Sequence, residues 1–291
     1  MFFATHSAFS IDGMDGTADV AASLVLASAL TLAIGAYVIA SVAAGRMLET
    51  ERVQREAALP LVGRAPMHAV CRALMPIGRG IASLGISANA VSVAALGIAG
   101  IATVAFATGH FGIAAAIACV ASLADGLDGF IARITKTQSR FGQVLDTTID
   151  RYVDALFLGG IAMYVHLNAA LLLVCMAAIV GSFMVSYASS VERELGVTGA
   201  PATMRRAHRL VYLLGASAIS PLVGHAFVDV APNAELVPVF IAVGAIAVLG
   251  NYSAVRRLLG AARIATARES APDSAPEVEA AVPSHGGGSP R

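Results

Sequence analysis

The stretch ADGLDGFIARITKTQSRFGQVLDTTIDR, residues 124–151, places four carboxylates between long apolar runs. Asp125 and Asp128 are three residues apart, and Asp146 and Asp150 are four apart, so each pair shares one face of a helix. Ionised side chains inside a membrane-spanning segment are costly and by default mark a functional site. The rest of the chain is therefore read as the scaffold that brings these two helix faces together.

The composition is that of a membrane protein. Of the 291 residues, 57% are hydrophobic and only 13% are charged, and the mean hydropathy is +0.76. Several apolar runs are long enough to cross a bilayer, so we expect an all-α polytopic protein in a lipid bilayer, with no nucleic-acid partner. The cysteines Cys71, Cys119 and Cys175 lack metal-type spacing and are expected to be small core residues.

The apolar runs divide the chain into four parts. Residues 1–44 are expected to contain an extra amino-terminal transmembrane helix, Val20–Ala44. Residues 45–86 interleave arginines with apolar residues, and Pro60, Pro66 and Pro76 are expected to break them into short amphipathic helices at the membrane surface; the alternative is a solvated linker. Residues 87–257 form the predicted six-helix catalytic domain, and 258–291 a disordered cytoplasmic tail. The six predicted segments are 89–107, 111–132, 143–164, 169–187, 210–228 and 236–254.

The basic residues predict the orientation of these segments. All 19 Lys and Arg lie in 45–86, 133–140, 188–209 and 255–291 or at Arg151, and the intervening hairpins have none. Because basic residues remain on the cytoplasmic side, we expect the amino terminus outside and the carboxyl terminus inside. The four Asp then lie at the cytoplasmic face of a bacterial-type inner or cell membrane.

Four carboxylates on facing helices are hard oxygen ligands of the kind that Mg²⁺ or Mn²⁺ prefers. Two such ions can neutralise a pyrophosphate during phosphoryl transfer. Among the basic residues only Arg133 and Arg151 are expected close enough to balance the four charges, so metal is the expected counter-charge. Gly126 and Gly129 leave room beside the carboxylates for a nucleotide.

The spacing Asp-x2-Asp-Gly-x2-Ala-Arg-x8-Gly-x3-Asp-x3-Asp, filled at residues 125–150, resembles the signature of the CDP-alcohol phosphatidyltransferase family. The resemblance covers roughly residues 65–257 and implies the six-helix bundle of that family, here with an extra amino-terminal helix. It implies transfer of a phosphatidyl group from CDP-diacylglycerol to the hydroxyl of a polar alcohol, with release of CMP, in phospholipid biosynthesis. It also implies a homodimer.

The resemblance assigns roles to individual residues. Asp150 would be the general base that deprotonates the acceptor hydroxyl. The implied metal ligands are Asp125, Asp128, Asp146 and, near a second ion, Asp150. The implied nucleotide-binding residues are Asp125, Gly129, Ala132, Arg133 and Asn89. Asn89 is otherwise only a polar residue near a helix start, where Ser87 is the better cap candidate.

The acceptor is indicated less directly. Ser139-Arg140-Phe141-Gly142 and the Asp150-Arg151 pair are similar to the branch that uses inositol 1-phosphate. A phosphorylated acceptor needs extra cations, and the candidates are Arg140, Arg151, Arg206 and Arg209. The alternative for Arg206 and Arg209 is a role in membrane topology alone. Asp154, one turn after Asp150, either supports the site from behind or pairs with Arg151.

Two other functions are compatible with the same carboxylates. One is a related phosphotransferase that moves a headgroup from a CDP-alcohol to a lipid alcohol, because both donors carry the same CDP group. The other, from a different class, is a divalent-cation transporter. Transporters place their sites near the bilayer midplane, often in matching repeats, whereas the four Asp here are expected at one face.

Overall fold

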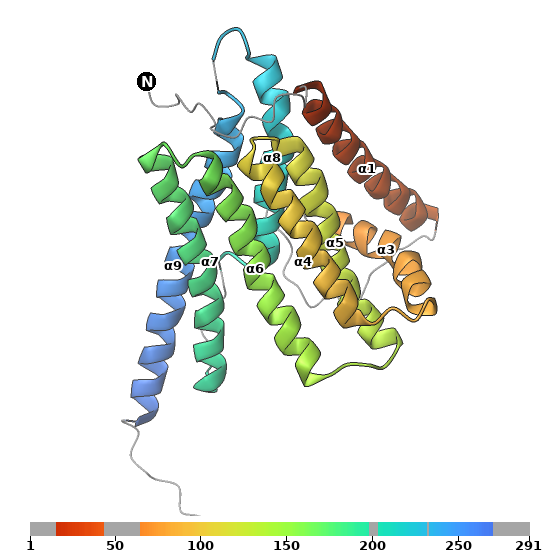
Figure 1. Ribbon diagram of the computed structural model, residues 1–291. Helices are drawn as coiled ribbons and strands as arrows, with labels where there is room; N and C mark the ends of the chain where they lie inside the picture. The colour runs from red at the N-terminus through yellow and green to blue at the C-terminus, as the bar shows by residue number, and fades with distance from the viewer. Residues whose placement is uncertain (1–15, 44–64, 198–202, 232, 270–291) are drawn as a thin grey trace, which may run out of the picture.

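The computed structural model describes residues 16–43, 65–197, 203–231 and 233–269, and the regular elements within them are all helices (Figure 1). This confirms the predicted all-α class. The helices are α1 Gly16–Ala43, α3 Ala65–Ser83, α4 Ala88–Ala107, α5 Phe111–Ile134, α6 Arg140–Tyr164, α7 Ala169–Glu194, α8 Arg206–Ala226 and α9 Leu236–Glu269. Helices α4 to α9 correspond, in order, to the six predicted segments.

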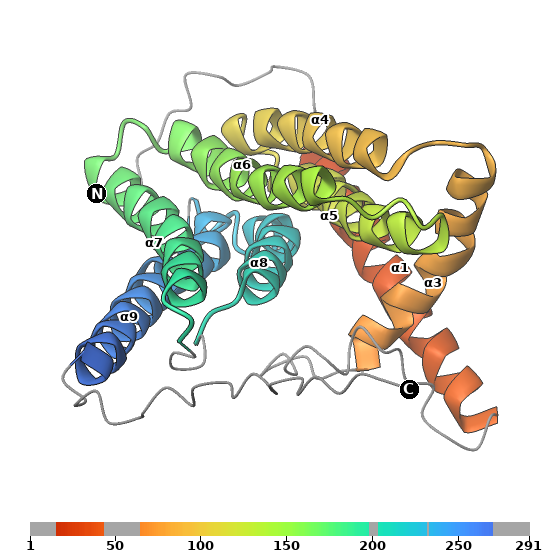
Figure 2. The ribbon, with the colours of Figure 1, turned by 90° about the horizontal axis from the view of Figure 1, so that it is seen from below.

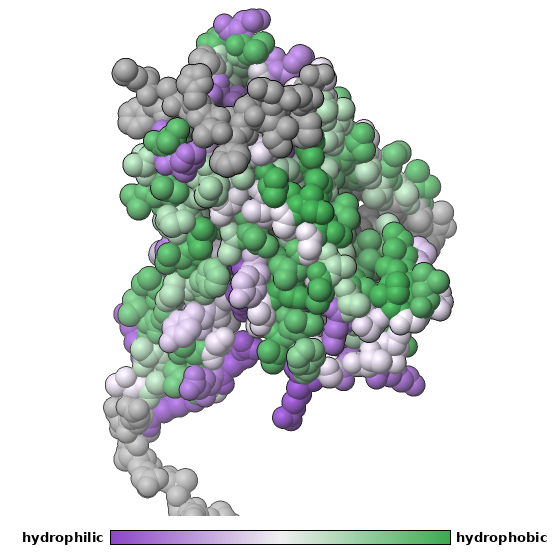
Figure 3. Space-filling view, in the orientation of Figure 1, coloured by the Kyte–Doolittle hydropathy of each residue, from purple (hydrophilic) through white to green (hydrophobic). Residues whose placement is uncertain are grey.

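The described helices have the hydropathy of a membrane bundle. Five of them, α1, α4, α5, α7 and α9, are long and apolar enough to cross a bilayer. Helices α6 and α8 are more polar. Helix α6 carries Asp146, Asp150 and Asp154, and α8 carries Arg206 and Arg209. Apolar side chains cover the middle of the face drawn in Figure 3, and hydrophilic ones gather at the end where α9 finishes. The protein is an integral membrane protein.

The bundle core lies where α4 packs against α5 and α6, while α7 pairs with α9 and α8 lies between α5 and α9. Viewed from below, α7 and α9 lie on one side of α8, and α1 and α3 lie on the other (Figure 2). Phe106 of α4 packs against Phe157 of α6, with ring centroids 5.8 Å apart. Gly160 lets these two helices approach, because a Cβ there would lie 2.6 Å from the carbonyl oxygen of Thr103. These contacts hold the carboxyl-terminal half of α6 against α4.

Helix α3 corrects one prediction. Pro76 lies inside this continuous helix and does not end it. Leu74 and Ile81 of α3 pack with the buried Leu127 and Ile131 of α5, and this packing offsets the backbone hydrogen bond that a proline removes. Arg72 and Arg79 are exposed, so α3 has a basic face besides its apolar one, and its place at the membrane surface stays a prediction. Residues 45–64, with Pro60, lie outside the described part.

The extra helix α1 docks on the bundle through a buried carboxylate. Asp19 is 8% exposed, and its Oδ1 accepts a hydrogen bond from the backbone N–H of Ile113, 2.8 Å away. That N–H belongs to the first turn of α5, where helix amides lack partners of their own. At Gly112 a Cβ would collide with the Asp19 carbonyl oxygen and with Ser23 Oγ. Asp19 therefore caps α5 from another helix.

Helix α9 also departs from the prediction, because it continues to Glu269 and includes residues 258–269 of the expected tail. Arg257 pairs with the carboxylate of Glu192 on α7. Arg268 donates hydrogen bonds to the carbonyl oxygens of Leu195 and Gly196, at 3.2 and 3.3 Å. These contacts tie the end of α9 to the end of α7. Residues 270–291 lie outside the described part.

Candidate active site and metal centre

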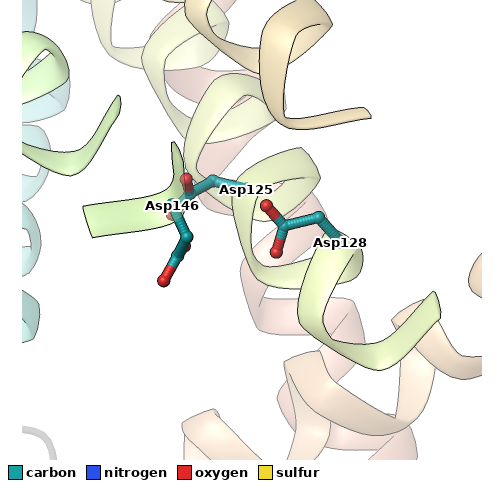
Figure 4. Close-up of side chains that lie close together, drawn as sticks. All are labelled: Asp125, Asp128 and Asp146. Carbon is teal, nitrogen blue, oxygen red and sulfur yellow. The ribbon is translucent and has the colours of Figure 1, made fainter. Parts of the chain in front are cut away.

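Three of the four predicted carboxylates meet in one cluster. Asp125 and Asp128 project from α5, Asp146 reaches in from α6, and one ligand oxygen from each lies within 4.8 Å of the others (Figure 4). Asp125 and Asp128 are buried, whereas Asp146 is exposed. We call these three residues the carboxylate triad. The cluster is therefore reachable from one side and enclosed by helices on the other.

Asp128 is fixed in place by hydrogen bonds. Ser92 of α4 donates its hydroxyl to Asp128 Oδ2, and the backbone N–H of Gly129 donates to Oδ1. Ser92 is buried and was not among the predicted site residues. Its signal in the sequence is a polar residue one turn after Asn89 on an otherwise apolar helix.

The triad has the donor set of a divalent-metal site. Three carboxylates supply the hard oxygen ligands that Mg²⁺ and Mn²⁺ prefer. Asp125 Oδ1 is buried and has no hydrogen-bond partner, and a buried carboxylate oxygen without a partner is costly unless a cation binds it. Asp125, Asp128 and Asp146 thus fit the predicted metal.

Arg206 corrects the expectation that only Arg133 and Arg151 lie close enough to balance these charges. Arg206 Nη1 lies 2.8 Å from Asp125 Oδ2 and 2.6 Å from Asp150 Oδ1. It reaches them from the first residue of α8. Asp150 is therefore joined to Asp125 through a guanidinium and is not a member of the triad. A role for Asp150 as ligand or base stays a prediction.

A second arginine of α8, Arg209, forms an ion pair with Asp154, which also lies near Arg206. Arg209 Nη2 lies 2.6 Å from Asp154 Oδ2, and Arg206 Nε lies 3.8 Å from Asp154 Oδ1. Asp154 thus pairs with the arginines of α8. Arg151, the partner that was predicted for Asp154, instead donates to the carbonyl oxygen of Thr147 at 2.7 Å and lies 3.9 Å from Asp150.

The helix starts beside the triad bring the predicted nucleotide residues near it. Ser87 caps α4 by accepting from Ala90 N–H at 3.2 Å, as predicted. Asn89 lies against the start of α6, where a Cβ on Gly142 would be 3.4 Å from Asn89 Oδ1. Arg133 reaches back over Gly129, with Nη1 3.5 Å from where a Cβ would be. Ala132 is half-buried on the same end of α5, and Arg140 is exposed at the start of α6.

A sequence model of the CDP-alcohol phosphatidyltransferase family matches residues 85–248 of the chain. The match covers more than half of the chain. The chain belongs to the CDP-alcohol phosphatidyltransferase family. The predictions of family and enzyme class are confirmed, and the competing prediction of a cation transporter is not supported.

Relatives of this transferase carry related names. An archaetidylinositol phosphate synthase of Pyrococcus horikoshii is 36% identical over 145 residues, which are 48% of this chain and 74% of that protein. A phosphatidylinositol phosphate synthase of Mycobacterium tuberculosis (strain ATCC 25618 / H37Rv) is 29% identical over 166 residues, 56% of this chain and 75% of that one.

Solved structures share the fold of the transferase. A crystal structure of the Mycobacterium tuberculosis phosphatidylinositol phosphate synthase with CDP-DAG bound has a TM-score of 0.57 at 24% identity, and covers 65% of this chain and 94% of that one. The same enzyme in complex with manganese and citrate has a TM-score of 0.57, at 24% identity, and covers 64% of this chain and 87% of that one. The predicted six-helix family fold is confirmed.

Proposed function

We propose that this transferase moves the phosphatidyl group of CDP-diacylglycerol to the hydroxyl of a phosphorylated inositol-type alcohol and releases CMP. The observation that carries this proposal is the carboxylate triad with two arginines of α8 beside it. The triad suits the metal-bound pyrophosphate of the donor, and Arg206 suits the phosphate of the acceptor, while Arg209 holds the neighbouring Asp154. The names of the two relatives support the same acceptor class.

In this proposal the residues divide the work between the two substrates. Asp125, Asp128 and Asp146 hold Mg²⁺ or Mn²⁺, which supplies charge stabilisation at the phosphates. The nucleotide lies along the end of α5 at Gly129, Ala132 and Arg133, with Asn89 opposite. The small residues let the nucleotide approach the helix backbone.

Asp150 accepts the proton of the acceptor hydroxyl as its oxygen attacks the phosphorus that bears diacylglycerol. The new bond joins the acceptor oxygen to that phosphorus, and the bond to the CMP oxygen breaks. Arg206 holds Asp150 beside Asp125 at 2.6 and 2.8 Å. The substitution Asp150→Asn should therefore lower CMP release by about 10²-fold or more, as expected for a lost general base.

The acceptor is tested by a screen of CMP release. Purified transferase in lipid receives CDP-diacylglycerol, Mg²⁺ or Mn²⁺, and one of inositol 1-phosphate, inositol, glycerol 3-phosphate, serine or choline. We expect turnover with inositol 1-phosphate and a phosphatidylinositol phosphate product by mass spectrometry. Release of CMP with another acceptor overturns the inositol phosphate assignment, and turnover only with a CDP-alcohol and diacylglycerol supports headgroup transfer instead.

A pair of arginine variants tests the acceptor site. Arg206 lies at the carboxylates, whereas the adjacent Arg205 is exposed. Arg206→Ala should lower kcat/KM for the phosphorylated acceptor by about 10²-fold or more, because it leaves buried charges unpaired. Arg205→Ala should change it less than about twofold. Equal effects would mean that Arg206 serves membrane topology only.

We further propose that the active site faces the cytoplasm and that the enzyme is a homodimer. The basic ends of the described helices, with Arg133, Arg140, Arg193 and Arg206, belong to the same end of the bundle as the triad, which supports the first proposal. Gly97 and Gly100 have nothing within 4 Å of a Cβ position and so remain available to a second copy. Cross-linking through Gly97→Cys in membranes tests the dimer.

A further inference from the structure

A small cavity lies next to the Asp154–Arg209 pair, where α6, α7, α8 and α9 meet. Asp154 and Arg209 line one side of it, Ser182 of α7 lines another, and apolar side chains such as Phe157 and Leu213 form the rest. The space open to the centre of a water-sized sphere is about 10 Å³, which is close to the room that a single water needs.

Two buried polar atoms at this cavity have no hydrogen-bond partner. Ser182 is 3% exposed and Arg209 is 4% exposed. Ser182 Oγ and Arg209 Nε are both enclosed, and neither donates or accepts a hydrogen bond. Buried polar groups in proteins are nearly always satisfied by protein or by ordered water.

Ser182 differs in this respect from the serines that follow it on α7. Ser186 Oγ donates to the carbonyl oxygen of Ser182 at 3.2 Å, and Ser189 Oγ donates to that of Val185 at 3.1 Å. Such bonds to the preceding turn are the usual solution for a serine within a helix. The hydroxyl of Ser182 remains without one and lies at the cavity instead.

We propose that the cavity holds one structural water, which accepts a hydrogen bond from Arg209 Nε and is bound by Ser182 Oγ. The charges of Arg209 and Asp154 balance each other, with Nη2 2.6 Å from Oδ2. The cavity therefore suits a neutral molecule that can both donate and accept hydrogen bonds. The volume admits one water and excludes larger ligands.

This water makes Ser182 and Arg209 positioning residues of the active site. The water fixes the Arg209 guanidinium, Arg209 holds Asp154, and Asp154 lies 3.8 Å from Nε of Arg206. Arg206 in turn contacts Asp150 and Asp125. This series of contacts connects Ser182 on α7, through Arg209 on α8 and Asp154 on α6, to Arg206 and the carboxylates. Its effect on turnover rests on the proposed function.

The water itself is tested by an experimental structure of the full chain at a resolution that shows ordered waters. We expect a density peak within about 3.2 Å of both Ser182 Oγ and Arg209 Nε. An empty cavity, or a Ser182 hydroxyl turned onto its own helix, overturns the proposal. This result does not depend on activity, so it is separate from failure of the proposed function.

The positioning role is tested with Ser182→Ala against Ser217→Ala. Ser217 is also fully buried, but its hydroxyl donates to the carbonyl oxygen of Leu213 on its own helix at 2.8 Å. Ser182→Ala should lower kcat by about 2- to 10-fold, the loss of one hydrogen bond, with an unchanged KM for CDP-diacylglycerol. Ser217→Ala should leave both constants within twofold. Equal kcat values for the two variants would overturn the positioning role.

Discussion

Asp128 is held in the triad by the hydroxyl of Ser92, and partners of this kind strongly affect metal affinity. Ser92→Ala should raise the Mn²⁺ concentration that gives half-maximal CMP release by about 10- to 100-fold. A metal titration of purified protein measures this directly. Ser122→Ala is the control, because Ser122 lies on α5 near the triad but donates to the carbonyl oxygen of Ala118 at 2.8 Å. An unchanged metal requirement in Ser92→Ala would contradict the assignment of Asp128.

For single residues, the sequence predicts which carboxylates lie together better than it predicts which arginines pair with them. The spacing of Asp125 and Asp128 is local, so helical periodicity alone places them on one face. Arg206 is 81 residues from Asp125, and Arg209 is 55 from Asp154. Their pairing depends on how α8 packs against α5 and α6, which hydropathy does not determine. The expectation that only Arg133 and Arg151 lie close enough to balance the carboxylates was wrong for that reason.

At the scale of the helix, two adjacent glycines of α6 form a natural comparison. A Cβ at Gly160 would lie 2.6 Å from Thr103 O and 2.9 Å from Phe106 Cβ, whereas one at Gly159 would meet nothing within 4 Å. Gly160→Ala should destabilise the protein by about 1–3 kcal/mol through overpacking. Gly159→Ala should be neutral or stabilising by up to about 1 kcal/mol. Thermal unfolding in detergent measures both, and equal shifts would contradict the α4–α6 contact.

The docking of α1 gives a second prediction at this scale. Asp19→Ala should destabilise the packing of α1 by about 1.5–3 kcal/mol, because it removes a buried hydrogen bond to a charged group. Thr31→Ala is the control on the same helix, since the Thr31 hydroxyl is exposed and donates within α1. Disulfide trapping between α1 and α5 reports the docking. Equal trapping in both variants would show that Asp19 does not hold the helix.

The helices themselves were largely predictable because apolar length determines a span. The errors lie where tertiary contacts decide. Pro76 is tolerated because α3 packs along α5 through Leu74 and Ile81. The extension of α9, residues 258–269, is too polar to be predicted as part of a membrane span, and Arg268 connects it to the end of α7. Packing of this kind is not encoded in local hydropathy.

For the whole molecule, the asymmetry of charge predicts one orientation in the membrane. In a background without Cys71, Cys119 and Cys175, Gln138→Cys lies between α5 and α6, and Leu167→Cys lies at the opposite end between α6 and α7. An impermeant thiol reagent should label position 138 in inside-out vesicles and position 167 in right-side-out vesicles. The reverse pattern would place the active site outside.

The carboxylate of Asp19 also constrains how the protein is made. Its partner, Ile113, is 94 residues further along the chain, and at about 5–20 residues per second the ribosome needs roughly 5 to 20 seconds to reach it. During that interval α1 is in the membrane without the amide that satisfies its buried acid. Helix α1 is thus docked only after α5 has been inserted. An amino-terminal fusion that delays this docking would leave an acid facing lipid.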